Sequence, residues 1–126
     1  MDFLVQAHQF MARAAAIFTA LVTLLALFTM IRRQDIGGDF WGAVIIGEIM
    51  LALQCLVGIA MLFTGLMPAR WLHFLYGLVA IMTWPAVFAF TKGQTSSREA
   101  TIWAVSSAFL FFIVQRVATT ALPLTF

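Results

Sequence analysis

The sequence predicts an all-α integral membrane protein, folded as a four-helix up-and-down bundle. Of its 126 residues, 63% are hydrophobic and 10% are charged, whereas the apolar share of a soluble domain is closer to half. Four apolar runs, each near the roughly 20 residues that a membrane-spanning helix needs, are separated by short polar breaks. Little sequence lies outside these runs, so residues 1–126 are expected to form a single transmembrane domain.

The first two spans are expected at about residues 10–31 and 41–66. Between them Gly37 breaks the chain, and Asp39 is placed to cap the second helix, because short polar side chains satisfy free N–H groups at a helix start. Gly65 is expected to end the second span. The short break makes the two helices antiparallel neighbours.

The third and fourth spans are expected at about residues 71–91 and 100–122. Pro85 lies inside the third span, where it removes a backbone donor and should kink the helix. Ser96 and Glu99 form a Ser-x-x-Glu capping box ahead of the fourth span.

Basic residues flank these spans unevenly, which predicts their orientation. The breaks after the first and third spans carry most of them, namely Arg32, Arg33, Lys92 and Arg98. The opposite side has Arg70 outside a span, with Arg13 and Arg116 slightly inside span ends. Because cytoplasmic loops are enriched in Lys and Arg, both termini are expected on the outer face of the membrane.

Composition and spacing argue against several functions. The formal charge is only +2 and the basic residues are scattered, so nucleic-acid binding is not expected. A lone cysteine, Cys55, allows neither an internal disulfide nor a cysteine-based metal site. No nucleophile–base arrangement, phosphate loop or zinc spacing occurs. The chain is therefore not expected to be an enzyme or to hold a metal in a ligand set of its own.

Two histidines form the candidate cofactor site. His8 precedes the first span and His73 lies near the start of the third. Alternate helices of an up-and-down bundle are parallel, so both imidazoles should lie at similar depth near the outer face, as axial ligands of heme b require. Tyr76 and Gly77 follow His73. Small residues leave room for a flat ring or allow bare helices to pack closely, and interfacial histidines also bind backbone, lipid or partner chains.

A stripe of small and polar residues runs along the second span at spacings of four and three, and it is the predicted helix-packing face. It consists of Gly47, Leu51, Gln54, Gly58, Met61 and Gly65. Gln54 would lie near mid-membrane, where its amide needs an internal hydrogen-bond partner. Gln54 therefore either joins helices or, together with His73 and Tyr76, contributes to a quinone site.

Ionisable residues inside spans are costly and need a reason. Glu48 lies about 10 Å inside the inner face, where it can accept a hydrogen bond from another helix, pair with a basic group of a neighbouring subunit, or relay protons. Arg13 and Arg116 can extend to the headgroups. Alternatively, these arginines pair with heme propionates or with an acidic partner.

The central stretch resembles one four-helix half of the heme A synthase family over about a third of the chain. The resemblance is carried by Glu48, by Leu-Gln-Cys-Leu-Val-Gly at 53–58, by Thr-Gly-Leu at 64–66 and by Leu-His at 72–73. In that family paired histidines hold heme near the outer face, which implies His73 as one axial ligand and His8 as its mate. Val5 and Gln9 stand where the family's Glu-x-x-His-Arg signature has Glu and Arg, so heme A synthesis itself is not expected.

In size and type the chain is similar to small four-span proteins of bacterial respiratory and photosynthetic membranes. The leading expectation is a non-catalytic accessory subunit of an electron-transport complex in the bacterial inner membrane. It would act by helix packing and assembly with other membrane subunits and lipids, without a cofactor of its own. The alternatives are a heme b-binding electron-transfer protein that uses His8 and His73, and a contributor to a quinone site.

Overall fold

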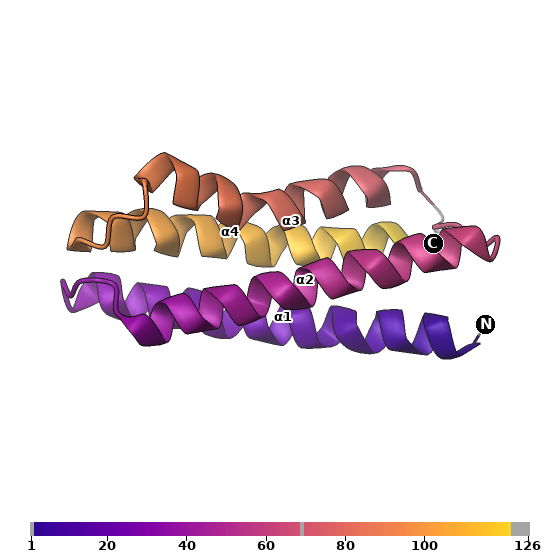
Figure 1. Ribbon diagram of the computed structural model, residues 1–126, viewed down its shortest axis with the longest axis horizontal. Coiled ribbons are helices and arrows are strands. Elements are labelled where there is room, and N and C mark those ends of the chain that lie inside the picture. The colour runs from indigo at the N-terminus through magenta and orange to yellow at the C-terminus, as the bar shows by residue number, and fades with distance from the viewer. Residues whose placement is uncertain (1, 69, 122–126) are drawn as a thin grey trace.

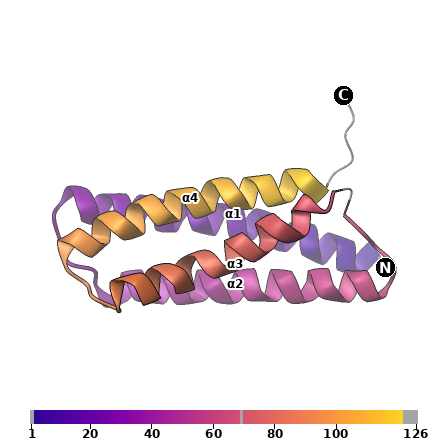
Figure 2. The ribbon, with the colours of Figure 1, turned by 90° about the horizontal axis from the view of Figure 1, so that it is seen from above.

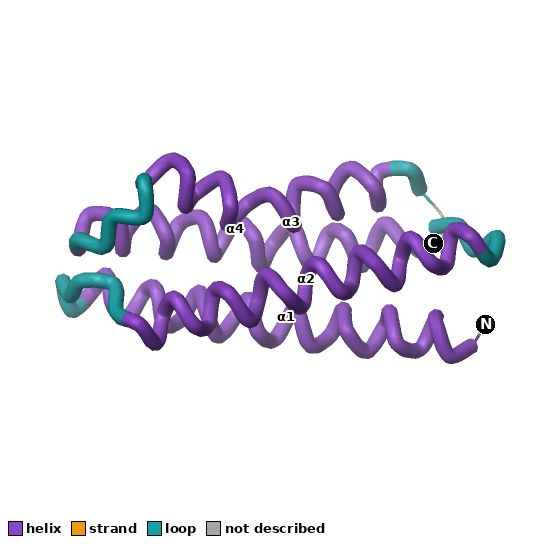
Figure 3. Tube along the Cα trace, in the orientation of Figure 1, coloured by secondary structure: helices purple, strands orange, loops and turns teal. Residues whose placement is uncertain are grey.

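The computed structural model describes residues 2–68 and 70–121, and over these residues the chain forms four helices and no strand. The helices are α1 (Asp2–Ile31), α2 (Gly38–Phe63), α3 (Leu72–Thr91) and α4 (Ser97–Ala121). They run lengthwise beside one another (Figure 1), and the connections lie at the two ends (Figure 3). Each helix is long and apolar enough to cross a membrane. The predicted all-α bundle is confirmed, and the chain has the form of a multi-pass membrane protein.

The helices form a ring in which α1 and α3 lie on a diagonal. Helix α1 packs against α2 and α4, and α3 packs mainly against α4 (Figure 2). Contact between α2 and α3 is sparse. Side chains of α1 and α3 can therefore meet only across the interior of the bundle.

The two ends of the bundle differ in what they contain. At one end, called the loop end here, connections 32–37 and 92–96 are joined by a hydrogen bond from the Ile36 N–H to the Thr95 carbonyl (2.8 Å). At the other, called the terminal end, α1 begins, α4 ends and the connection 64–71 joins α2 to α3 (Figure 1). Most of the predicted flanking arginines and lysines therefore belong to the loop end.

The helix starts differ from the prediction in two places. Helix α1 begins at Asp2 rather than near residue 10, so His8 is part of the helix instead of preceding it. The N-cap of α2 is Gly37, and Asp39 lies within the first turn, so the predicted cap at Asp39 is wrong. An acidic side chain in the first turn is still favourable there, because it faces the positive end of the helix dipole.

Helices α2 and α3 each end two residues before a left-handed glycine, Gly65 or Gly93. Helix α2 ends at Phe63, a few residues before the predicted 66, and Gly65 adopts a left-handed φ of 87° while the Leu66 N–H reaches the Met61 carbonyl at 3.0 Å. Helix α3 continues through Pro85 and ends where predicted, with a left-handed Lys92. The predicted end of the fourth span at Leu122 lies outside the described residues, and so does Ala69 in the connection between α2 and α3.

The core is centred on two tryptophans. Trp84 and Trp103 are each 1% exposed, and the Trp84 Nε1–H donates to the Ser107 hydroxyl at 3.1 Å. The ring of Trp84 packs against Gly47, where an added Cβ would lie only 2.6 Å from a ring carbon. Gly47 therefore serves the packing role that the glycine stripe predicted for it.

The capping box at the start of α4 is present in part. The Ser96 N–H donates to a Glu99 carboxylate oxygen at 3.1 Å, and the Ser96 hydroxyl also donates to that oxygen. In the full motif the serine side chain would instead accept from the Glu99 N–H. The carboxylate nevertheless satisfies a free donor at the helix start, as the sequence predicted.

Candidate functional site: a histidine pair across the bundle

His8 of α1 and His73 of α3 meet at the terminal end of the bundle. Their ring centroids are 6.1 Å apart and the ring planes are inclined by 61°. His8 lies in the second turn of α1, and His73 lies in the first turn of α3. Since α1 and α3 are diagonal neighbours, the two imidazoles bridge the interior at a common depth, as expected for alternate helices.

His73 is held in place by α4. Its Nδ1 lies 2.8 Å from the backbone carbonyl oxygen of Val117. A carbonyl oxygen only accepts hydrogen bonds, so Nδ1 carries a proton, and in the neutral imidazole the lone pair is then on Nε2. Histidines that bind metals commonly donate their other ring N–H to a carbonyl or carboxylate in this way, which fixes both tautomer and orientation.

The ring of His8 lies beside the backbone of Gln54 on α2. Its Nδ1 is buried and has no hydrogen-bond partner among the described residues. The ring lies against Gly58 of α2, where an added Cβ would be 3.2 Å from the His8 Cε1 atom. Gly58 thus lets α2 come close to the imidazole, and any larger residue would require the ring to move.

Gln54 lies one helical turn before Gly58 on α2. Its Oε1 is buried and is likewise without a hydrogen-bond partner in the described part of the chain. The amide was predicted either to join helices or to contribute to a quinone site, and among the described residues its Oε1 accepts no hydrogen bond from another helix. His8 Nδ1 and Gln54 Oε1 are therefore two buried polar atoms near the same face of α2. Neither forms a hydrogen bond with a described residue.

Around His73 the surface is partly open. Gly77 follows it by one turn, and no described atom lies within 4 Å of a Cβ built there. Tyr76 is covered by Arg116, whose guanidinium carbon lies 5.9 Å from the ring centroid. Arg116 and Arg13 are both exposed. Gly65 is also exposed, with open space around an added Cβ, so within the chain it terminates α2 rather than packing helices.

The histidine pair fits heme better than a bare metal ion. Within the described residues no group of three or more His, Cys, Asp or Glu side chains could hold a metal, whereas protein zinc sites use three or four such ligands. A porphyrin supplies the equatorial nitrogens itself and takes only axial ligands from the protein. Two imidazoles whose facing nitrogens each lay about 2 Å from one metal would have ring centroids roughly 6 Å apart. The His8 and His73 centroids are 6.1 Å apart, in an edge-to-face arrangement.

Comparisons of the chain with protein-family models, with curated proteins and with solved structures found no match. The resemblance to the heme A synthase family therefore stays a prediction from sequence. The function has to be argued from the geometry of the histidine pair and its surroundings.

Glu48 lies apart from the histidines, on the half of α2 nearer the loop end. Ten residues separate it from Gly58, which corresponds to about 15 Å along a helix. Its Oε1 is buried without a hydrogen-bond partner in residues 2–68 and 70–121, and so is the Trp103 Nε1. The Trp103 ring is 1% exposed, and hydropathy alone could not reveal that its N–H lacks an acceptor.

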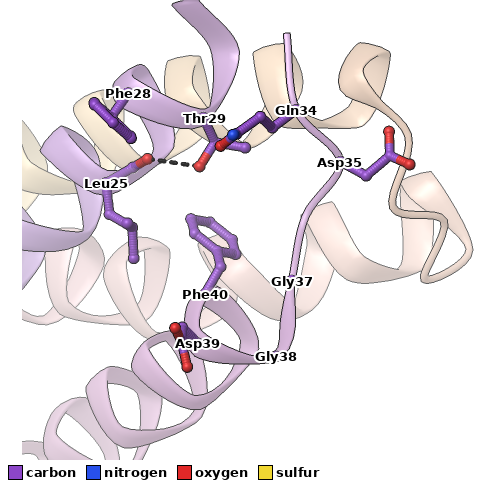
Figure 4. Close-up of a pocket in the computed structure, with 9 residues that line it drawn as sticks. All are labelled: Leu25, Phe28, Thr29, Gln34, Asp35, Gly37, Gly38, Asp39 and Phe40. Atoms are coloured by element: carbon purple, nitrogen blue, oxygen red, sulfur yellow. Dashed lines mark hydrogen bonds between the residues drawn. The ribbon is translucent and has the colours of Figure 1, made fainter. Parts of the chain in front are cut away.

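A hollow lies at the turn between α1 and α2 (Figure 4). The Thr29 hydroxyl beside it donates to the Leu25 carbonyl of its own helix at 2.9 Å. In Figure 4 the Asp35 carboxylate points away from the Phe40 ring and out of the hollow. The polar groups that line this hollow do not converge on one point. The histidine pair is therefore the stronger candidate site.

Proposed function

We propose that the chain binds heme b at the terminal end of the bundle, with His8 and His73 as axial ligands, and that it transfers electrons within the membrane. The observation that carries this proposal is the 6.1 Å approach of two imidazoles from diagonal helices. The hydrogen bond from His73 Nδ1 to Val117 supports it, because it leaves Nε2 free as a ligand.

The bound heme would supply reversible one-electron chemistry, and the chain would supply the ligands and their environment. His73 is oriented in advance by α4, whereas the His8 ring is positioned sterically by Gly58. Gly77 lies on the same helix face as His73, and no side chain lies within 4 Å of a Cβ added there. Arg116 is exposed near this end, where its charge could pair with a propionate.

The test is heme binding by the purified full-length chain and by matched variants. Wild type is expected to take up one heme per chain with the absorption bands of a low-spin cytochrome b. His8→Ala and His73→Ala should each lose this spectrum, whereas Gln9→Ala, an exposed residue beside His8, should keep it. Heme uptake that is equal in all four proteins would refute axial ligation by this pair.

A second candidate function is a non-catalytic accessory subunit of a respiratory or photosynthetic complex in the bacterial inner membrane. It is favoured by the small, open positions Gly65 and Gly77, where a helix of another subunit could approach closely. In that case His73→Ala would disrupt assembly with the neighbouring subunits while the wild-type chain purifies without heme. The two roles are compatible if the heme-binding chain is itself a subunit.

A further inference from the structure

A cavity of about 440 Å³ opens between α2, α3 and α4 near the loop end. This volume is within the roughly 300–1,000 Å³ typical of small-molecule sites. The cavity lies where α2 and α3 make little contact, so it opens towards the surrounding lipid. Its walls are mostly apolar and include four aromatic rings. The residues that matter for the argument are Trp41, Glu48, Trp84, Phe88 and Trp103.

Two of the residues that line this cavity carry buried polar atoms without a partner. Glu48 Oε1 and Trp103 Nε1 form no hydrogen bond with any described residue. Trp84, in the same wall, does have a partner, since its Nε1–H donates to Ser107. Unpaired polar groups are costly in a membrane interior, where water cannot replace the missing bonds. A ligand that offers an oxygen to the indole and a polar group to the carboxyl would satisfy both.

We propose that this cavity binds the headgroup of a lipid-soluble quinone. A quinol hydroxyl can donate to an ionised Glu48, and a protonated Glu48 can donate to a quinone carbonyl, so the carboxyl suits both redox forms. The Trp103 N–H donates to an oxygen of the same ring. The rings of Trp41 and Phe88, whose centroids are 5.7 Å apart, provide an aromatic wall for a flat headgroup.

The lining also disfavours a phospholipid headgroup as the occupant. No arginine, lysine or histidine lines the cavity in the described part of the chain, so a phosphate would meet a carboxyl group with no compensating positive charge. A quinone carries no charge and a long apolar tail. The tail could leave through the lipid-facing opening between α2 and α3.

This site is independent of the histidine pair, and the quinone alternative predicted at Gln54, His73 and Tyr76 concerns the opposite end of the bundle. Loss of heme binding would leave the cavity unchanged, and loss of quinone binding would leave the histidines unchanged. The two proposals can therefore fail separately.

The test is a titration of the purified full-length chain, in phosphatidylcholine nanodiscs, with the short-tailed analogue decylubiquinone. Quinones quench tryptophan fluorescence, and three of the four tryptophans line the cavity. Wild type is expected to show saturable quenching. Glu48→Leu and Trp103→Phe should each raise the dissociation constant about tenfold, the size expected for one lost buried hydrogen bond.

Trp71→Phe is the matched control, since it removes an exposed indole at the terminal end and should leave the dissociation constant unchanged. Glu48→Leu replaces one good helix former by another and adds no polar group to the membrane interior, so it carries the test if Trp103→Phe fails to fold. Non-saturable quenching, or the same dissociation constant in wild type and Glu48→Leu, would overturn the proposal. A phospholipid that co-purifies with wild type and is lost from Glu48→Leu would overturn it too.

Discussion

The Nδ1 atom of His73 lies 2.8 Å from the carbonyl oxygen of Val117, which ties the first turn of α3 to the last turns of α4. The same carbonyl accepts a hydrogen bond from the Thr120 hydroxyl at 2.9 Å. This arrangement sets the tautomer of His73 and directs its Nε2 away from α4. One ligand of the proposed heme is thus oriented by a neighbouring helix rather than by its own.

Gly58→Ala is expected to weaken heme binding. The new Cβ would lie 3.2 Å from the His8 Cε1 atom, so the ring would have to shift by a few tenths of an ångström. We expect the heme dissociation constant to rise roughly tenfold, or about 1.4 kcal/mol, measured by heme titration. Gly42→Ala is the control, because open space surrounds an added Cβ there. Unchanged affinity in Gly58→Ala would contradict the placement of His8 against α2.

Gly47→Ala is expected to destabilise the bundle. Its Cβ would lie 2.6 Å from the Trp84 ring, and Trp84 is 1% exposed and has little room to move. Overpacking of this kind costs about 1–3 kcal/mol. Unfolding by SDS in mixed micelles would measure the loss, again with Gly42→Ala as the control. A stability equal to wild type would mean that α2 and α3 do not pack as described.

Ser107→Ala is expected to cost about 1–3 kcal/mol of unfolding free energy. It removes the acceptor of the Trp84 Nε1–H, which is buried and has no water to replace it. Ser106→Ala, at the neighbouring half-buried position, should cost less than half as much in the same SDS titration. Equal losses in the two variants would show that the tryptophan hydrogen bond contributes little.

Glu99→Gln is expected to destabilise the start of α4 modestly. The carboxylate accepts from both the N–H and the hydroxyl of Ser96, and a neutral amide oxygen is a weaker acceptor. Amide hydrogen exchange at residues 97–100 should report the loosening. An exchange rate that does not change would indicate that the connection 92–96 is held by its other contacts.

Much of the fold could be predicted because hydropathy and glycine placement determine where helices cross and end. The left-handed glycines Gly65 and Gly93 illustrate this, as do the apolar runs themselves. The pairing of His8 with His73 was also predictable, since alternate helices of such a bundle are parallel. The anchor of His73 was not, because a backbone carbonyl such as that of Val117 leaves no trace in residue identity.

The cavity beside Glu48 was beyond sequence reasoning for a related reason. Glu48 and Trp103 come from helices far apart in the chain, and their convergence depends on how loosely α2 and α3 pack. The start of α1 at Asp2 was missed because its first residues are too polar to count as a span. Asp39 was misplaced as a cap because Gly37 takes the extended conformation that begins the helix.

The most direct measurement is low-temperature electron paramagnetic resonance of the oxidised, purified full-length chain, combined with its heme content. Ligation by His8 and His73 predicts one heme b per chain with the low-spin ferric signal of two imidazole ligands. His73→Ala should convert any remaining heme to a high-spin signal, with free imidazole restoring the low-spin form. A wild-type chain that purifies without heme and takes up none on addition would contradict the proposed function.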